Sequence, residues 1–304
     1  MMSASVIICT YNRGESLRET LENLDTGLIV PKIPLEIIVV DNNSSDDTRD
    51  IVNIHIRKSR IETRYIFEKC QGKSYALNRG VREANGDIVC FTDDDVLVRR
   101  DWIVNIMRVF DETGCACVGG KILLRLGKTR PEWLGDKMME QYGLLDLGND
   151  VLFLKTPKLY GANIAVRKSV FRDHGYFDVN LGPKAEKMHD SEDISFINRL
   201  IRGGEKVLYS PDVVIEHVVP AKHIEKSYLR NRAFYQAELK GMNEVPAEGR
   251  NIFGIPLYML REVLTTAMEI MYLRFVSPVI SFQKEIFLVD RIGFMAGRIK
   301  QKRP

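Results

Sequence analysis

The stretch that most constrains the fold is residues 88–98, which read IVCFTDDDVLV. An apolar run typical of a buried strand leads directly into Asp93, Asp94 and Asp95. Three adjacent carboxylates repel one another, and burial at the edge of a core raises the cost of their charge. A metal cation, or the cationic part of a ligand, is therefore expected at this strand end.

The residues before and around this stretch alternate between strand and helix patterns. Such alternation predicts an α/β fold with a parallel sheet that carries helices on both faces. Ligands bind such sheets beyond the carboxyl ends of the strands. We expect strands at 5–9, 35–40, 64–67 and 88–91, with polar clusters after three of them at 10–13, 41–43 and 93–95. These three clusters are expected to form one site.

After residue 115 the alternation loosens. CACVGGKILL, starting at Cys115, predicts a strand, and residues 193–202 predict a helix that ends before Gly203. Two short strands are expected on either side of Pro211, and from Pro220 onward the pattern is helical. The chain therefore divides into an α/β domain at 1–221 and a helical extension at 222–304.

Composition places the chain among globular proteins. Its 304 residues are 45% hydrophobic and 28% charged, and they suffice to bury a sizeable core. A net charge of +3 does not indicate a nucleic-acid-binding protein. Residues 222–304 carry 14 Lys/Arg and 8 Asp/Glu, a net charge of +6, which leaves −3 for residues 1–221. A mildly acidic body is thus followed by a basic tail.

The cysteines and the N-terminus indicate a cytoplasmic protein. The five cysteines are odd in number and three lie in apolar runs, which favours buried thiols in a reducing compartment over disulfides. Cys115 and Cys117 form C-x-C without a second pair, so a zinc site is not expected. The N-terminus lacks the features of a secretory signal, and no stretch of about 18 apolar residues is free of charge.

The acidic motifs suggest binding of a metal and a nucleotide. Mg²⁺ typically combines one or two carboxylates with substrate phosphates, which favours a metal site at 93–95 over an Asp-rich turn that caps a helix near Asp101. Asp41, also at a strand end, is either a turn residue or an acceptor for a base or ribose. An EF-hand is excluded, because Asp46 and Val52 stand where glycine and glutamate are required.

The segment QGKS at 71–74 is not a P-loop. That motif requires a glycine where Phe67 stands. Lys73 or Arg79 is nevertheless expected either over a phosphate or on a solvated helix face.

Two further motifs carry possible chemistry. Glu192 and Asp193 open a helix, where acidic residues favour the helix dipole. Alternatively, one of them is a general base that takes the proton of an attacking hydroxyl. His217 lies at the end of a strand. It is either a packed or capping histidine, or a residue that binds a metal or contacts a phosphate.

Taken together, these stretches resemble a family 2 glycosyltransferase of GT-A fold, over about residues 1–220. The resemblance implies a Rossmann-like, mostly parallel central sheet flanked by helices, with a GT-A catalytic domain at 1–221. The segments that match, in the family's order, are SVIICTYNRGESLRETLENL, EIIVVDNNSSDDT, GKSYALNRGVREANGDIVCFTDDDVLV, GANIAVRKSVFRDHGYFD and SEDISFINRLIRGGEKVLYSPDVVIEH.

The resemblance also implies roles for individual residues. Asp95 and Asp93 of the D-x-D motif, with His217, are expected to bind Mg²⁺ or Mn²⁺, although the family usually has a small residue where Asp94 stands. Asp193 is the expected base, with Glu192 beside it. The expected nucleotide contacts are Thr10, Tyr11, Arg13, Asp41, Lys73, Arg79, Asp93 and Asp94, and the expected donor and acceptor pocket comprises Gly161, Ala162, Asn163 and Trp133.

The implied reaction is a metal-dependent single displacement. Asp193 deprotonates an acceptor hydroxyl, which attacks the anomeric carbon of a nucleotide-diphosphate sugar and inverts its configuration. A UDP-sugar is the expected donor and a glycan or lipid-linked molecule the expected acceptor. Cell-surface polysaccharide synthesis is suggested by analogy. Two rivals remain: a sugar-nucleotide pyrophosphorylase, for which CTYNRGES is poor in glycine and basic residues, and a non-catalytic carbohydrate-binding or scaffold protein that retains the fold.

The tail at 255–304 is open to two interpretations. Apolar residues nearly encircle a helix that includes Arg261, Glu262, Glu269 and Arg274. Such a helix packs against the catalytic body or in a dimer. Alternatively, this basic segment, which ends in GRIKQKRP, contacts anionic lipids as a peripheral membrane element, at the inner face of the membrane. The sequence leaves the oligomeric state open.

Overall fold

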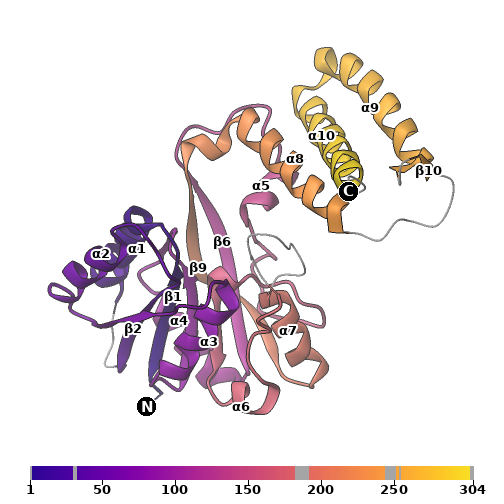
Figure 1. Cartoon of the computed structure of the whole chain (residues 1–304). Coiled ribbons are helices and arrows are strands. Elements are labelled where there is room, and N and C mark those ends of the chain that lie inside the picture. The colour runs from indigo at the N-terminus through magenta and orange to yellow at the C-terminus, as the bar shows by residue number, and fades with distance from the viewer. Residues whose placement is uncertain (1, 30–32, 182–191, 244–250, 253–254, 302–304) are drawn as a thin grey trace. The chain divides into compact units, whose positions relative to one another are not determined.

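The computed structural model describes residues 2–29, 33–181, 192–243, 251–252 and 255–301, which form two compact units (Figure 1). The first unit takes the described residues within 1–125, 143–184 and 189–218. The second takes those within 126–142 and 219–304. Segment 126–142, which the sequence analysis assigned to the α/β domain, thus belongs to the same unit as the C-terminal helices.

The first unit is built on one sheet with strand order β3-β2-β1-β4-β8-β6-β9-β5, and β7 pairs with β9. β3, β2, β1 and β4 are parallel neighbours, whereas β8 is antiparallel to β4 and to β6. The predicted α/β fold with a central parallel sheet flanked by helices is confirmed, and antiparallel strands extend it.

The helices and strands of the first unit follow the predicted alternation. Their bounds are β1 Ala4–Thr10, α1 Gly14–Gly27, β2 Leu35–Asp41, α2 Thr48–Ile56, β3 Glu62–Phe67, α3 Lys73–Glu83, β4 Ile88–Asp93, β5 Val96–Val98, α4 Trp102–Thr113, β6 Cys117–Leu126, β7 Leu152–Phe153, the 3-10 turn η2 Gly161–Asn163, β8 Ile164–Arg167, α6 Val170–His174, α7 Glu192–Arg202 and β9 Val207–Val219.

The core explains why the parallel strands read as continuous apolar runs. β1, β2 and β4 are buried along nearly their whole length, as expected for strands covered on both faces. Helix α3 lies close to β1, since a Cβ at Gly80 would stand 2.6 Å from the Ile7 side chain. All five cysteines are free thiols, and Cys90, Cys115 and Cys117 are buried, as predicted.

One strand prediction needs correction. The two short strands expected around Pro211 are a single strand, β9. Leu208 and Tyr209 pair with β7, and Ile215 to His217 pair with β5. Pro211 lies between these ladders, so its missing N–H disrupts neither of them.

The second unit is mainly helical. Helix α8 packs against α10, and α10 packs against α9. The α8–α10 contact is close because Gly241, Gly293 and Gly297 face backbone atoms of the opposing helix, and a Cβ at Gly297 would stand 2.0 Å from the Glu238 carbonyl oxygen. The elements are α5 Asp136–Met139, the 3-10 turns η1 Glu140–Tyr142 and η3 Ala221–Ile224, α8 Lys226–Asn243, a short hairpin of β10 Asn251–Ile252 and β11 Ile255–Pro256, α9 Leu257–Val276 and α10 Pro278–Gln301.

Candidate active site

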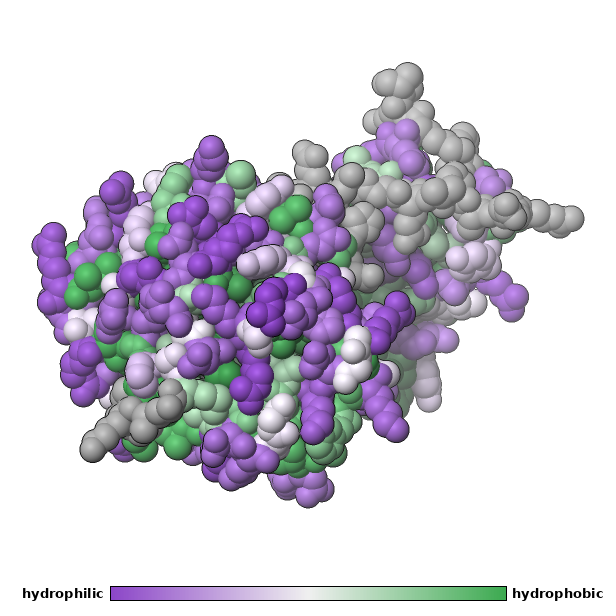
Figure 2. All heavy atoms as spheres, turned by 90° about the horizontal axis from the view of Figure 1, so that it is seen from below, coloured by the Kyte–Doolittle hydropathy of each residue, from purple (hydrophilic) through white to green (hydrophobic). Residues whose placement is uncertain are grey.

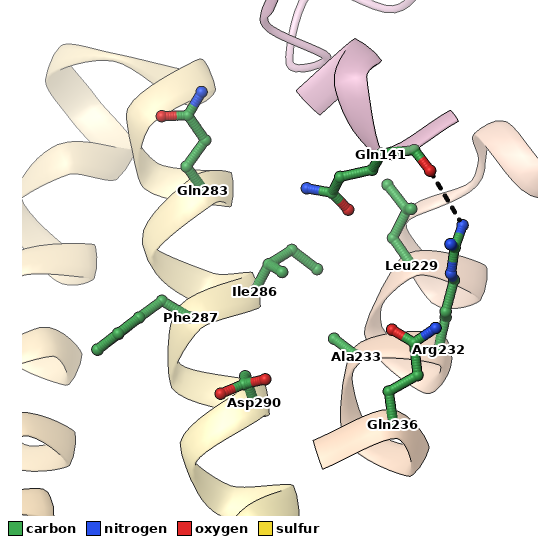
Figure 3. Close-up of a pocket in the computed structure, with 9 residues that line it drawn as sticks. All are labelled: Gln141, Leu229, Arg232, Ala233, Gln236, Gln283, Ile286, Phe287 and Asp290. Atoms are coloured by element: carbon green, nitrogen blue, oxygen red, sulfur yellow. Dashed lines mark hydrogen bonds between the residues drawn. The ribbon is translucent and has the colours of Figure 1, made fainter. Parts of the chain in front are cut away.

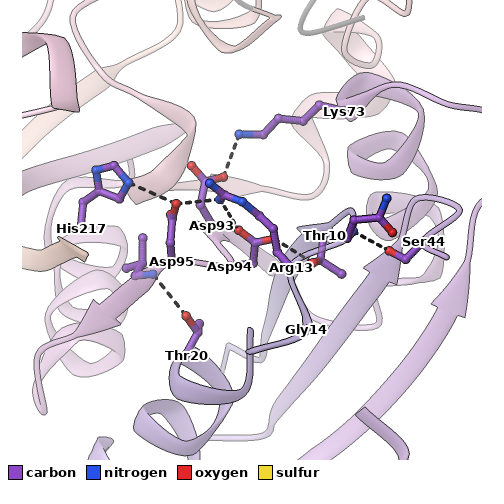
Figure 4. A network of polar contacts seen from close by, with 12 residues as sticks. Thr10, Arg13, Gly14, Thr20, Ser44, Lys73, Asp93, Asp94, Asp95 and His217 are labelled. Carbon is purple, nitrogen blue, oxygen red and sulfur yellow. Dashed lines mark hydrogen bonds and ion pairs between the residues drawn. The ribbon is translucent and has the colours of Figure 1, made fainter. Parts of the chain in front are cut away.

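The three predicted polar clusters meet at one edge of the sheet. β1, β2 and β4 end at the same level, because Thr10 is aligned with Asp41 and Cys9 with Asp93. Side chains that leave these strand ends therefore converge, as Figure 4 shows. The three clusters that the sequence analysis expected to form one site thus lie together at this edge, and their role in binding stays a prediction.

The loops after β1 and β2 are joined into one rim. Asn12 and Asn43 adopt left-handed backbone conformations (φ 52° and 68°), which asparagine tolerates better than most residues. The Asn12 N–H donates to Ser44 Oγ (2.9 Å), and Asn12 Oδ1 accepts from the Ser45 N–H (2.7 Å). The Ser44 N–H in turn donates to Asp41 Oδ1 (2.8 Å). These bonds fix the positions of the residues expected to contact a nucleotide.

The acidic triplet is accompanied by two cationic side chains (Figure 4). Arg13 Nη1 contacts Asp94 Oδ1 at 2.8 Å and Asp95 Oδ2 at 2.7 Å. Lys73 Nζ contacts Asp93 Oδ1 at 2.7 Å. Burial opposes the charge of both cations, but the neighbouring carboxylates outweigh it and raise the pKa of Arg13 and of Lys73. Arg13 and Lys73 thus provide the positive charge that the triplet requires.

Asp94 and Asp95 differ in ionisation. Asp94 is almost fully buried, and burial raises its pKa to about 6 despite Arg13 and the hydrogen bond from Thr10 Oγ1 (2.7 Å). For Asp95 burial acts in the same direction, but the hydrogen bond and charge of His217, with those of Arg13, lower its pKa to about 2. Asp95 is therefore the carboxylate that stays ionised most readily.

Asp95 and His217, two of the expected metal ligands, lie in contact. Asp95 Oδ2 lies 3.3 Å from His217 Nε2, which is the separation of an ion pair. Carboxylate oxygen and imidazole nitrogen are both donors that divalent cations accept. In the described part of the chain, no group of three or more His, Cys, Asp or Glu side chains forms a ligand cluster. Metal binding at this place stays a prediction.

The expected base-binding end of the site is organised around Asp41. Its carboxylate is buried and accepts hydrogen bonds from Tyr65 Oη (2.7 Å) and the Ser44 N–H. Tyr11, at the end of β1, is half-exposed, so its ring is accessible for stacking. Arg79 forms an exposed ion pair with Glu83 one helical turn along α3 (2.9 Å), which matches the solvated-face alternative for this residue.

Glu192 and Asp193 lie at the first turn of α7, where both are buried. Asp193 Oδ2 accepts the Gly161 N–H at 2.6 Å, and Oδ1 accepts the Ile194 N–H at 2.8 Å. Burial raises the pKa of Glu192, although Lys73 opposes the shift. Glu192 and Asp193 also help to raise the pKa of Lys73, so this lysine interacts electrostatically with the acidic pair as well as with the triplet.

The residues expected in the sugar pocket have different surroundings in the structure. Gly161 contacts Asp193, and Ala162 packs against the core. Asn163 is a correction, because its side chain is fully buried and bonds to Trp102 Nε1 and to the carbonyls of Lys121 and Val213. It positions the segment from within the core.

Trp133 belongs to the second unit, whereas Gly161 and Asp193 belong to the first. The Trp133 ring packs edge-on against Phe282 at 4.6 Å, and Lys226 lies over its face. In the structure Trp133 thus contacts residues of the helical unit, and its expected place in the sugar pocket stays a prediction.

Two contributors were missed by sequence reasoning. Ser44 Oγ accepts a hydrogen bond from the loop after β1. This role could have been predicted, because Ser44 lies in the polar run DNNSSDDT, whose residue types commonly form hydrogen bonds in turns. The role of Tyr65 could not, because its partner Asp41 comes from the neighbouring strand.

The second unit contains a cavity of about 440 Å³ between η1, α8 and α10 (Figure 3). Arg232 and Asp290 lie in its wall with Ile286 and Phe287. It holds none of the residues that the sequence analysis selected, so it does not compete with the strand-end site. Among the described residues, no helix combines the length and the apolar character needed to cross a bilayer.

Comparison with known proteins identifies the family. Residues 5–175 match glycosyl transferase family 2. The chain is 28% identical over 250 residues to the glucosyl-dolichyl phosphate glucuronosyltransferase of Haloferax volcanii, covering 79% of this chain and 76% of that protein. It is 25% identical over 235 residues to the succinoglycan biosynthesis protein ExoM of Rhizobium meliloti, covering 77% of this chain and 72% of that protein.

Solved structures agree on the fold. The mannosyltransferase PcManGT from Pyrobaculum calidifontis, in complex with GDP-Man and Mn²⁺, superposes with a TM-score of 0.61 at 18% identity, over 99% of this chain and 87% of that one. TarS of S. aureus in complex with UDP gives a TM-score of 0.55 at 16% identity, over 99% and 92%. The match to the family over more than half of the chain, together with these relatives, shows that this protein belongs to glycosyl transferase family 2 and is a glycosyltransferase of GT-A fold.

Proposed function

We propose that the protein transfers a sugar from a nucleotide-diphosphate sugar to a hydroxyl of a glycan or lipid-linked acceptor, with a divalent metal and with inversion. The observation that carries this proposal is the position of Lys73. Its ammonium contacts Asp93 of the D-x-D motif and interacts electrostatically with Glu192 and Asp193. This supports the assignment of the diphosphate end and the base to one site, as a single displacement requires.

The metal site proposed here consists of Asp95 and His217, with Asp93 close by. Mg²⁺ or Mn²⁺ bound there would neutralise the charge that develops on the leaving diphosphate. Arg13 and Lys73 supply two further cations at the same place. Their present partners are carboxylates, so a bound diphosphate and metal would let both side chains exchange those partners for phosphate oxygens.

Asp193 is the residue that we assign as general base. The backbone bonds from Gly161 and Ile194 hold both of its oxygens, which fixes the direction of the carboxylate. A Cβ at position 161 would stand 3.2 Å from Asp193 Oδ2, so glycine there leaves room for the base. Asp193 takes the proton of the acceptor hydroxyl as that oxygen bonds to the anomeric carbon and the bond to the diphosphate breaks. Inversion follows from this single displacement.

The donor that we propose is a UDP-sugar, bound with its base near Tyr11 and Asp41. TarS, which was solved with UDP, supports this choice, whereas PcManGT was solved with GDP-Man, so a GDP-sugar is the alternative that the test includes. We also propose a role in polysaccharide or lipid-linked glycan assembly, which the succinoglycan biosynthesis protein ExoM and the glucosyl-dolichyl phosphate glucuronosyltransferase of Haloferax volcanii support. A location at the cytoplasmic face of the membrane stays an expectation from the sequence. Membership of a glycosyltransferase family sets aside the pyrophosphorylase alternative.

A test that needs no acceptor uses water in its place. The protein is incubated with UDP-, GDP- and TDP-sugars, with Mn²⁺ or with EDTA, and diphosphate release is followed together with the anomer of the freed sugar by NMR. We expect release from one donor only with metal, loss of release in Asp95→Asn, and a first-formed sugar of inverted configuration. Metal-independent release would refute the metal role, and a retained anomer would refute the single displacement.

A further inference from the structure

Helix α9 carries a row of large apolar side chains on its exposed face. Their exposed fractions lie between 59% and 93%, far above those of core residues. The row recurs at intervals of three and four residues, so it forms one face of the helix, and its members are Leu264, Met268, Met271, Tyr272 and Phe275. We call this row the apolar face of α9.

The opposite side of α9 is turned toward α10 and carries both polar and apolar residues. Glu262 pairs with Arg291 (3.0 Å) and Glu269 pairs with Lys284 (2.7 Å). Met259 and Thr266 are the buried residues of the helix, and Ile270 and Leu273, on the same side, are partly buried. The side toward α10 thus supplies the buried residues of α9, while a second set of apolar side chains points outward.

An arrangement of this kind requires an apolar environment outside the helix. Soluble proteins scatter exposed apolar residues singly, as on the face in Figure 2, where hydrophilic and hydrophobic residues are interspersed. Contiguous apolar surface instead marks a contact with a protein or a membrane. The 20 residues of α9 correspond to a helix about 30 Å long, and the apolar face covers its second half.

We propose that the apolar face of α9 inserts into the surface of an anionic lipid layer, with the helix axis in the plane of the membrane. The ion pairs of Glu262 and Glu269 with α10 require this orientation, because lipid on all sides would surround both glutamates with hydrocarbon. The contact is independent of the proposed chemistry, and it would bring a lipid-linked acceptor to the protein.

Charge favours lipid over a second copy of this chain as the occupant. Residues 222–304 carry a net charge of +6, and Arg261 and Arg274 are exposed on α9 itself. Two such surfaces repel each other, whereas anionic headgroups attract them. Tyr258 and Tyr272 are also exposed on α9, and tyrosine is the kind of side chain that suits the boundary between headgroups and acyl chains.

The test measures binding to sedimenting vesicles, without nucleotide or metal. The vesicles are phosphatidylcholine alone or phosphatidylcholine with 30% phosphatidylglycerol, an amount on the order of the anionic content that attracts basic segments. The variant is Leu264→Gln/Phe275→Gln, which keeps helix propensity. The matched control is Phe153→Gln, which removes a phenylalanine that is similarly exposed on β7 of the first unit. Melting temperatures confirm that all three proteins are folded.

We expect wild type and Phe153→Gln to bind the anionic vesicles. The affinity of the double variant should be lower by about tenfold or by a larger factor. Failure of wild type to bind, or equal binding by the double variant, would overturn the proposal. Light scattering on the same proteins gives the remaining outcome. If wild type is a dimer that does not bind vesicles and the double variant is a monomer, a second copy of the chain covers this face, and the proposal is overturned. UDP-dependent thermal shifts, measured separately, test the proposed function and do not depend on this result.

Discussion

Both oxygens of Asp193 accept backbone N–H groups, so replacing this residue by asparagine separates its chemical role from its structural one. The amide oxygen of asparagine can keep the bond from Gly161 or the bond from Ile194. The amide NH₂ then meets the other N–H and cannot accept its hydrogen. The substitution therefore removes one hydrogen bond at a buried position and abolishes the base.

The two effects differ in size. Loss of one buried backbone hydrogen bond costs about 2 kcal/mol, which lowers the melting temperature by about 4–8 °C. Loss of a general base lowers kcat by about 10²–10⁴-fold. The variant should consequently be folded at 25 °C, bind UDP with Mn²⁺ as wild type does, and turn over far more slowly.

The assay compares Asp193→Asn with Glu192→Gln, its sequence neighbour, by diphosphate release under saturating donor. Glu192→Gln should retain activity within about tenfold of wild type, because its buried carboxyl is assigned to balancing charge around Lys73 and not to proton transfer. Near-normal kcat in Asp193→Asn would refute the base assignment. Loss of activity in Glu192→Gln alone would transfer that role to Glu192.

Three further predictions concern stability and charge. Glu36→Gln should cost about 2 kcal/mol at pH 7, because Ser5 Oγ and the Asn85 N–H donate to its buried carboxylate. Burial opposes them, but these bonds lower the pKa of Glu36 from its ordinary 4.5. The stabilisation thus exists above that value and disappears as the pH falls through the lower folded-state pKa, so urea unfolding at pH 7 and pH 3 should show the difference from wild type shrinking in acid. Gly297→Val should lower the free energy of unfolding by about 3 kcal/mol or more, since the new side chain would overlap backbone of α8; calorimetry that finds wild-type stability would contradict the close crossing. Arg13→Gln removes the cation between Asp94 and Asp95, so Mn²⁺ without nucleotide should raise the melting temperature of this variant more than that of wild type.

The sequence predicted the strands and the edge where the site lies, because both follow from local patterns. Apolar runs that end in polar residues identify strand ends, and parallel topology brings those ends together. Asp41, the triplet and Thr10 could therefore be placed at one edge from spacing alone. The structure adds the register that aligns them.

Contacts between distant segments could not be predicted in this way. The pairing of Arg13 with Asp94 and Asp95 joins residues about 80 positions apart. The Tyr65–Asp41 hydrogen bond joins two neighbouring strands, β3 and β2. The contacts of Trp133 could not be predicted for the same reason. Its surroundings depend on Phe282, far along the chain, and no local pattern records which unit an irregular segment joins.

The tail shows a different limit. An apolar pattern that nearly encircles a helix does not reveal which side faces the protein. In α9 the structure decides this, because Met259 and Thr266 are buried and Glu262 and Glu269 pair with α10, whereas the apolar face of α9 is exposed. The last three residues of the basic segment GRIKQKRP, 302–304, lie outside the described residues, so the expected contribution of that end stays a prediction.

The central claim is that the acidic strand ends bind a nucleoside diphosphate together with a divalent metal through Asp95. Thermal unfolding of wild type and Asp95→Asn, with UDP, GDP or TDP and with Mn²⁺ or EDTA, tests it most directly. A ligand at 100 times its Kd stabilises the folded state by about 2.7 kcal/mol, a rise of about 5–10 °C in melting temperature. The account predicts this rise for one diphosphate in wild type with Mn²⁺, and its loss with EDTA and in Asp95→Asn. Equal shifts in both proteins, or no shift with any of the three diphosphates, would contradict it.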